Sequence, residues 1–259
     1  MKHLSVIIVL TIGIPFIANA EEIAKTSFYY DIQWGNLVIG HIDGSLERKD
    51  NSIKLKVKSE SEGAISLLYN YKSDLFSSSY KQDDIWRANS YVVNSAIKSQ
   101  KYYSKVLWNK KNNKPDYKID PPLDLEKVHN VRQSTLKNVI DPITAMIKII
   151  EKVNKNKPCD TTLNIFDGRR RYTLLSRELK KQYLINDRPR SYKGETAVCG
   201  IKFIPVGGHW IDSKWDPKND KFSDIKVFFG TASNGSYLPV RLNLNKWFGT
   251  VTVRLLENN

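Results

Sequence analysis

A two-residue alternation of apolar and charged side chains recurs along this chain and leaves few folds open to it. The pattern is clearest at 53–58, where isoleucine, leucine and valine alternate with three lysines. Such alternation is typical of a strand with one buried face and one face in water. We therefore expect Lys54, Lys56 and Lys58 to form a basic row on the solvent side of a sheet.

Eleven further segments carry a strand signal: 27–34, 37–46, 71–80, 85–93, 102–108, 161–166, 170–176, 197–204, 225–229, 238–244 and 248–256. Turn pairs separate several of them: Gly35-Asn36, Asp50-Asn51, Asp83-Asp84, Asp167-Gly168 and Asn234-Gly235. Short strands at this spacing predict a mainly β fold, with one antiparallel curved sheet that forms an open barrel, half-barrel or spiral. A two-sheet sandwich would give a similar pattern.

A single amphipathic helix is predicted at about 141–153. Asp141-Pro142 supplies an N-cap followed by a proline in the first turn. Apolar residues then follow at helical spacing: Ile143, Met146, Ile147, Ile150 and Val153. We expect this helix to pack on the concave face of the sheet. A short helical turn is predicted at 64–69, and residues 109–140 and 207–223 are predicted to be irregular.

The first twenty residues have the pattern of a secretory signal peptide. Lys2 precedes an apolar run from Leu4 to Ile17 that is too short to span a bilayer, and Ala18-Asn19-Ala20 is a small-x-small cleavage site. Cleavage near Ala20 would leave a single β-rich domain at 21–259. The sequence thus predicts a periplasmic or secreted protein that does not span a membrane.

The cysteines and the charge balance fit an exported protein. Cys159 and Cys199 predict one structural disulfide, because two cysteines in an oxidising compartment pair most simply with each other. Lysine and arginine number 41 against 27 acidic residues, a formal net charge of +14. For an exported protein such a surplus favours anionic lipid, lipopolysaccharide or another envelope protein as a partner rather than nucleic acid. A general lysine bias in composition would give the same surplus.

Several segments resemble domain of unknown function 3108, a family of bacterial exported proteins. The matching segments are Tyr30–Gly35, Val38–Gly40, Gly63–Tyr69, Asp141-Pro142, Cys159–Tyr172, Cys199, Leu238–Arg241 and Phe248–Val251. The run Phe166–Tyr172, Phe-Asp-Gly-Arg-Arg-Arg-Tyr, is the most distinctive of them. The resemblance implies a single envelope-associated β domain, and it assigns no catalytic or binding residue.

The arginine run is the candidate binding site. A two-residue turn at Asp167-Gly168 would pair Ile165 with Arg170 and place Arg170 and Tyr172 on the inner, apolar face. Arg169 and Arg171 would then lie on the other face. A guanidinium in apolar surroundings needs a carboxylate, backbone carbonyls or a bound anion. Arg170 is therefore either a structural tie between strands or, with Tyr172, Arg169 and Arg171, part of an anion-binding site.

No motif in the chain indicates catalysis. His41, His129 and His209 lack the close spacing of a helical metal site, and no Gly-x-Ser-x-Gly element is present. Gly207-Gly208 does not lead from a strand into a helix, as a phosphate loop would. We therefore expect no catalytic residue, no metal and no cofactor.

These observations predict a non-enzymatic envelope protein that binds a hydrophobic or amphiphilic, anionic lipid-like ligand or supports envelope integrity. One alternative is a periplasmic protein–protein interaction or structural module without a small ligand. A lesser alternative is a hydrolase that acts on an envelope polymer.

Overall fold

The computed structural model describes residues 24–213, 219–246 and 249–257. Within them, thirteen strands form one antiparallel sheet. The strands are β1 (Ala24–Trp34), β2 (Leu37–Lys49), β3 (Ser52–Ser61), β4 (Tyr71–Gln82), β5 (Ile85–Ile97), β6 (Gln100–Trp108), β7 (Pro115–Asp120), β8 (Thr161–Phe166), β9 (Arg171–Leu184), β10 (Gly194–Gly207), β11 (Ile225–Thr231), β12 (Tyr237–Lys246) and β13 (Gly249–Leu256). The helices are α1 (Ile65–Leu68), the 3-10 turn η1 (Gln133–Leu136) and α2 (Pro142–Asn154).

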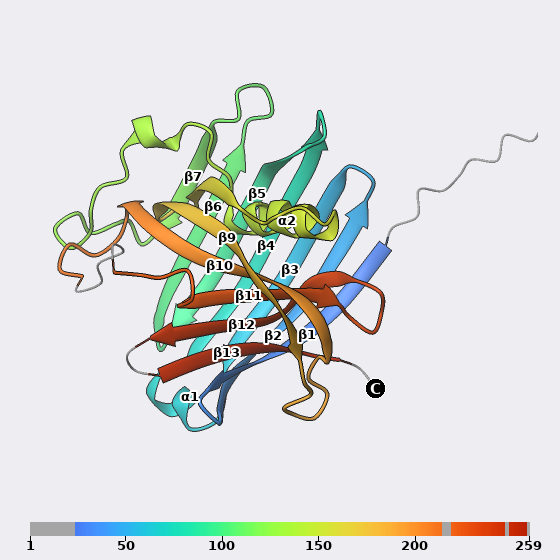
Figure 1. Ribbon diagram of the computed structural model, residues 1–259. Helices are drawn as coiled ribbons and strands as arrows, with labels where there is room; N and C mark the ends of the chain where they lie inside the picture. Colours follow the sequence, from blue (N-terminus) through green and yellow to red (C-terminus); the bar gives the residue numbers. More distant parts are fainter. Residues whose placement is uncertain (1–23, 214–218, 247–248, 258–259) are drawn as a thin grey trace, which may run out of the picture.

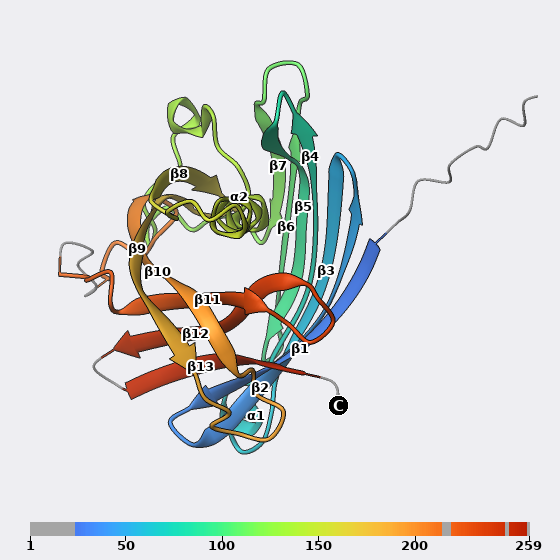
Figure 2. The same ribbon diagram turned by 45° about the vertical axis from the view of Figure 1, so that its right-hand side comes forward.

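The sheet is curled but not closed. Its strand order is β7-β6-β5-β4-β3-β2-β1-β13-β12-β11-β10-β9-β8, so β7 and β8 are the two edges and β1 pairs with β13 in the middle. Figures 1 and 2 show β8–β10 curling round to face β3–β6, with α2 lying between them. The predicted mainly β, single-sheet open fold is therefore confirmed.

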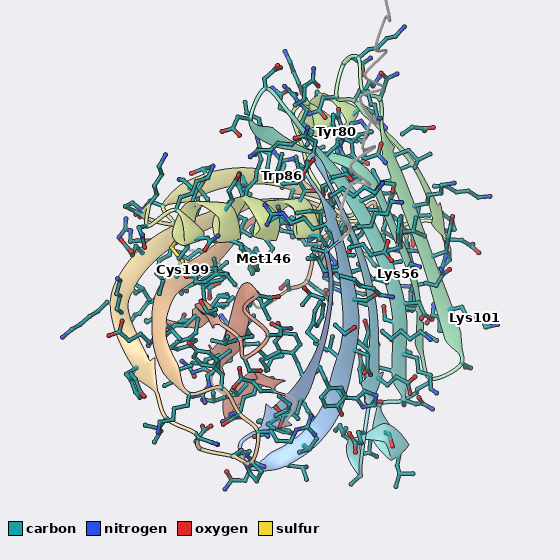
Figure 3. All side chains as sticks on the ribbon, turned by 90° about the vertical axis from the view of Figure 1, so that its right-hand side faces the viewer. Lys56, Tyr80, Trp86, Lys101, Met146 and Cys199 are labelled. Atoms are coloured by element: carbon teal, nitrogen blue, oxygen red, sulfur yellow. A yellow bond between two sulfur atoms is a disulfide. The ribbon has the colours of Figure 1, made fainter. Side chains whose placement is uncertain are left out.

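Helix α2 lies inside the curl (Figure 2). It begins after Asp141, whose carboxylate accepts hydrogen bonds from the backbone N–H groups of Ile143 and Thr144 at 2.9 and 3.0 Å. The helix contacts β4, β5, β8 and β12. Ile147 packs in one buried cluster with Trp86 of β5, and Figure 3 places Met146 on the side of α2 that faces the enclosed space. The predicted helix and its position on the concave face are thus confirmed.

The disulfide is also confirmed. Cys159 and Cys199 are bonded, with their Cα atoms 6.3 Å apart. The bond ties the segment that follows α2 to the centre of β10, and both residues are 1 % exposed. It therefore holds the C-terminal end of the helix against the curled half of the sheet.

One prediction about local structure needs correction, and two predicted segments lie wholly or partly outside the described residues. The segment 109–140 was expected to be irregular, yet it contains strand β7 and the turn η1. The predicted turn at 64–69 is present as α1. The predicted signal peptide at 1–20 lies outside the described residues, as do 214–218 of the predicted loop. No helix in the described ranges has the length and apolar character needed to cross a bilayer.

Candidate anion-binding pocket at the β8–β9 turn

The turn between β8 and β9 is longer than the sequence predicts. Phe166 pairs with Arg171 and Ile165 with Tyr172, so four residues, 167–170, form the loop instead of two. The carboxylate of Asp167 accepts hydrogen bonds from the backbone N–H groups of Arg169 at 2.9 Å and Arg170 at 2.6 Å. This capping by one side chain stabilises the wider turn, and the predicted register is wrong for that reason.

The wider turn changes the position of Arg170 but not the pattern of faces. Because the loop gains two residues, each strand keeps its alternation. Leu163, Ile165, Tyr172 and Leu174 therefore share the inner face as predicted. Ile165 and Leu174 are buried in the hydrophobic core, and Leu163 and Tyr172 pack against it. Arg170 lies in the loop and is exposed, so the expectation that it is buried among apolar side chains is wrong.

The buried arginine of the run is Arg171. It was predicted to be on the outer face, and it is on the face opposite Tyr172, but the segment around η1 covers that face. Its Nε donates to the carbonyl of Thr135 at 2.9 Å and one terminal nitrogen donates to the carbonyl of Tyr172 at 2.5 Å. Burial lowers the pKa of Arg171. Arg171 is thus a structural tie held by backbone carbonyls.

Arg169 ties the same turn to the far edge of the sheet. A terminal nitrogen donates to the carbonyls of Asp120 at 2.7 Å and Pro121 at 2.8 Å, and the guanidinium lies 5.3 Å from the ring centroid of Tyr102. Burial lowers the pKa of Arg169, and the charge of Asp167 partly opposes this. Arg169 therefore links the ends of the two edge strands, β7 and β8, which are not paired with each other in the sheet.

Gly207 and Gly208 allow the end of β10 to pass beside this turn. A Cβ on Gly208 would lie 1.9 Å from the carbonyl oxygen of Arg169, and one on Gly207 would lie 2.7 Å from that of Asn130. Gly208 also has a φ of +77°. This pair is required by close packing of backbone, and the packing brings the rings of His129 and His209 to 4.4 Å between centroids.

A pocket of about 260 Å³ opens beside the turn. It is lined by Asp167, Arg170, Arg171, Tyr172, Phe203, Pro205, Gly207 and His209. The rings of Tyr172 and Phe203 meet edge to face at 5.5 Å and form its apolar wall. The guanidinium of Arg170 makes no hydrogen bond or ion pair with any residue that the structure describes. Three of the four predicted binding residues thus line one pocket, and Arg169 does not.

Two titratable groups in this pocket, Asp167 and His209, change charge with pH, and protonation of either favours a bound anion. Burial raises the pKa of Asp167, although the nearby charge of Arg170 lowers it in part. Burial also lowers the pKa of His209, and His129 adds to this effect. The raised pKa of Asp167 favours loss of its negative charge as pH falls, and the lowered pKa of His209 favours its neutral ring.

Sequence reasoning missed Asp167, Phe203 and His209 as pocket residues. Phe203 and His209 lie on β10 and just after it, more than thirty residues from the arginine run, and no local pattern links them. The unusual glycine pair at 207–208 was the available signal, because paired glycines mark places where backbones approach closely. The described residues contain no group of three or more histidine, cysteine, aspartate or glutamate side chains that could hold a metal ion.

A second cavity of about 470 Å³ lies between strands β1–β3 and the β11–β12 turn. Phe28, Leu238 and Leu255 supply apolar lining, and Lys56 and Lys58 supply cations. A Cβ on Gly44 would lie 2.0 Å from the Phe28 ring, so the glycine allows that ring to lie flat on β2. Two lysines of the predicted basic row thus contribute to a cavity that the sequence did not predict.

Comparison with known proteins gives a likeness in fold alone. No family model matches the chain, and no curated protein matches it. Among solved structures, the chain is similar to the crystal structure of a β-barrel-like protein of domain of unknown function DUF1849 from Brucella abortus. The two share 12 % sequence identity at a TM-score of 0.50, over 89 % of this chain and 95 % of that one. The chain therefore shares the β-barrel-like architecture of that protein.

Proposed function

We propose that this chain is an exported, non-enzymatic envelope protein that binds an anionic amphiphile, with the anionic group at Arg170. The observation that carries the proposal is the unpaired guanidinium of Arg170 beside the aromatic wall of Tyr172 and Phe203. Its two neighbours in the sequence are both tied to backbone carbonyls. Arg170 is thus the arginine of the run that is free to bind.

The lining suits a head group followed by a short apolar segment. Arginine presents parallel N–H donors that match a carboxylate or phosphate. Phe203 and Pro205 offer apolar surface to the first methylene groups of a chain. A pocket of about 260 Å³ is small for a ligand site, so the rest of an amphiphile would extend outside it.

The export part of the proposal is supported by two observations. The Cys159–Cys199 disulfide is of a kind that persists in oxidising compartments. The first twenty residues have the pattern of a signal peptide. We also propose membership of domain of unknown function 3108, which is supported by the sequence run Phe166–Tyr172 that forms this turn.

The test is calorimetric titration with octyl phosphate, with octyl glucoside as the uncharged probe. We expect octyl phosphate to bind the natural chain and to bind R170A at least about tenfold more weakly, since an ionic hydrogen bond is worth about 1.5–3 kcal/mol. R48A, which removes an exposed arginine on β2, is the matched control and should bind normally. Equal binding by both variants, or equal binding of both probes, would contradict the proposal.

The alternative, a protein-interaction module, is favoured by a second observation at the same place. Ile204, Val206, Trp210 and Ile211 are 43, 39, 58 and 51 % exposed and flank the pocket along the chain. If a protein partner covers them, crosslinking in the native host should give one stoichiometric partner that W210A loses. Loss of that partner without any effect on octyl phosphate binding would favour this alternative.

A further inference from the structure

Exposed apolar side chains gather on neighbouring turns at one end of the molecule. Leu67 and Leu68 of α1 are 87 and 73 % exposed, and Tyr69 is 48 % exposed. Trp34 and Leu37, on either side of the β1–β2 turn, are 44 and 53 % exposed. Single exposed leucines are common on the surfaces of soluble proteins. Several large exposed apolar side chains on adjacent turns instead mark an interaction site.

Backbone contacts hold these turns side by side. The N–H of Glu62 donates to the carbonyl of Ile39 at 2.9 Å, and the N–H of Lys98 donates to that of Asn70 at 2.7 Å. The Arg188 guanidinium donates to the carbonyl of Asn36 at 3.0 Å. The β1–β2, β3–β4, β5–β6 and β9–β10 connections therefore form one surface, seen at the bottom of Figures 1 and 2 around α1.

Local hydrogen bonds fix the turn that projects the two leucines. Gly63 adopts a φ of +65°, and its carbonyl accepts a hydrogen bond from the Ser66 hydroxyl at 2.7 Å. The N–H of Tyr69 donates to the carbonyl of Ile65 at 2.7 Å, and none of the residues of α1 is buried. The turn is thus ordered by its own backbone, and Leu67 and Leu68 are left to contact something other than this chain.

Two exposed lysines lie at the β5–β6 connection beside these apolar tips, and one of the nearby glutamates is paired with a third lysine. Lys98 and Lys101 are exposed and form no ion pair with any residue in the described part of the chain. Glu60 lies 3.4 Å from Lys72, and Glu62 lies 3.4 Å from His41. Within the described residues the unpaired lysines Lys98 and Lys101 therefore supply positive charge at this end, which complements an anionic partner.

We propose that this end of the molecule docks on an anionic lipid bilayer. Leu67 and Leu68 enter the boundary of the acyl chains, as the apolar residues of interfacial segments do. Trp34 and Tyr69 lie at head-group depth, where their amphipathic rings are favoured. Lys98 and Lys101 contact lipid phosphates, each contributing through the negative surface potential.

A bilayer suits this surface because the apolar groups protrude from several turns. Protruding tips enter a deformable interface more readily than a rigid protein surface, which would need matching pockets for each side chain. The docking surface shares no residue with the Arg170 pocket. Docking on a bilayer is therefore independent of ligand binding at Arg170.

The experiment is co-sedimentation of the natural chain with vesicles of phosphatidylcholine that contain a minor fraction of phosphatidylglycerol. The test variant is L67S/L68S, whose side chains are exposed, so that folding is preserved. The matched control is L125S, a leucine that is 57 % exposed elsewhere on the surface. We expect the double variant to bind vesicles at least about tenfold more weakly and L125S to bind normally.

A charge variant separates a bilayer from other occupants. K98E/K101E should also weaken binding, and added salt should weaken binding of the natural chain. R170A should bind vesicles normally, so failure of the proposed ligand site and failure of docking are distinguishable. Normal vesicle binding by L67S/L68S, or no binding by the natural chain, overturns the proposal. Capture of a protein through these leucines without vesicle binding overturns it too.

Discussion

The carboxylate of Asp141 accepts a hydrogen bond from the hydroxyl of Ser77 at 3.0 Å and thereby joins the start of α2 to the middle of β4. The same carboxylate caps the helix through Ile143 and Thr144. Asp141 is fully buried. One side chain therefore begins the helix and also fixes its position inside the curled sheet.

Replacing Asp141 should destabilise the fold strongly. D141A leaves the first backbone N–H groups of α2 and the Ser77 hydroxyl buried without their acceptor, so we expect a loss of about 2–4 kcal/mol in the free energy of unfolding. S77A removes one donor of several and should cost about 1 kcal/mol. Urea unfolding of both variants measures the difference, and equal losses would show that the cap is unimportant.

Gly208 should tolerate no side chain. In G208A the new Cβ would meet the Arg169 carbonyl at 1.9 Å, in addition to the strain of a φ of +77°. G235A is the control, since Gly235 has a φ of +80° but no atom within 4 Å of the added Cβ. We expect about 1–2 kcal/mol for G235A from backbone strain alone and clearly more for G208A. Thermal unfolding that ranks them in the opposite order would contradict the packing described at the β8–β9 turn.

Asp187 should make stability depend on pH in the acid range. Its carboxylate bridges Arg241 at 2.8 Å and Arg254 at 3.1 Å. Burial tends to raise the pKa of Asp187, but the hydrogen bond from Arg254 and the charges of both arginines outweigh this and lower it. A carboxyl with a lowered folded-state pKa stabilises the protein above its unfolded pKa of about 4, and this stabilisation is lost as pH falls through the folded value.

We therefore expect D187N to be less stable than the natural chain at neutral pH. The difference in unfolding free energy should shrink as pH falls below about 4. D116N, which removes an exposed carboxylate on β7, should track the natural chain at every pH. Chemical unfolding across a pH series is the measurement, and a constant difference between D187N and the natural chain would remove Asp187 as the linked group.

Anion binding at Arg170 should strengthen as pH falls. Protonation of Asp167, whose pKa is raised by burial, removes the negative charge that faces the ligand. Protonation of His209 adds positive charge, but its lowered pKa delays this step to more acidic pH. D167N keeps an oxygen to cap the turn and should bind octyl phosphate with a weaker dependence on pH than the natural chain does. Calorimetric titration of the natural chain and D167N at several pH values tests this, because the ratio of their affinities cancels the titration of the phosphate itself, and a ratio that does not change with pH would contradict it.

The strands could be predicted because alternation reports directly which side of a strand is buried. All twelve predicted strand segments correspond to strands of the sheet, although Phe248 lies outside the described residues. Strand β7 was missed because it is an edge strand of six residues that begins with Pro115 and carries alternating charges. The sequence of such a segment resembles that of a loop. An edge strand pairs on one side only, so it tolerates charged residues and a proline that has no N–H group to donate.

The register at the arginine run could not be predicted from local residues. Asp167-Gly168 is compatible with a two-residue turn, and the choice of a four-residue loop depends on the Asp167 carboxylate and on contacts with distant backbone. The residue that is buried, Arg171, differs from the predicted Arg170 by one position. Which arginine stays free is thus decided by η1 and the β6–β7 edge.

The pairing of β1 with β13 has a consequence for the order of assembly. In space, strands β8 to β13 follow one another across the sheet and are followed by β1 to β7. The sheet is therefore a meander in which β13 and β1 are neighbours but are not joined by a connecting loop. During synthesis β1–β7 can form one half early, but the two halves join only when the last strand emerges. A chain circularly permuted within 121–140 would remove this delay and should form the same sheet in simple sequential order.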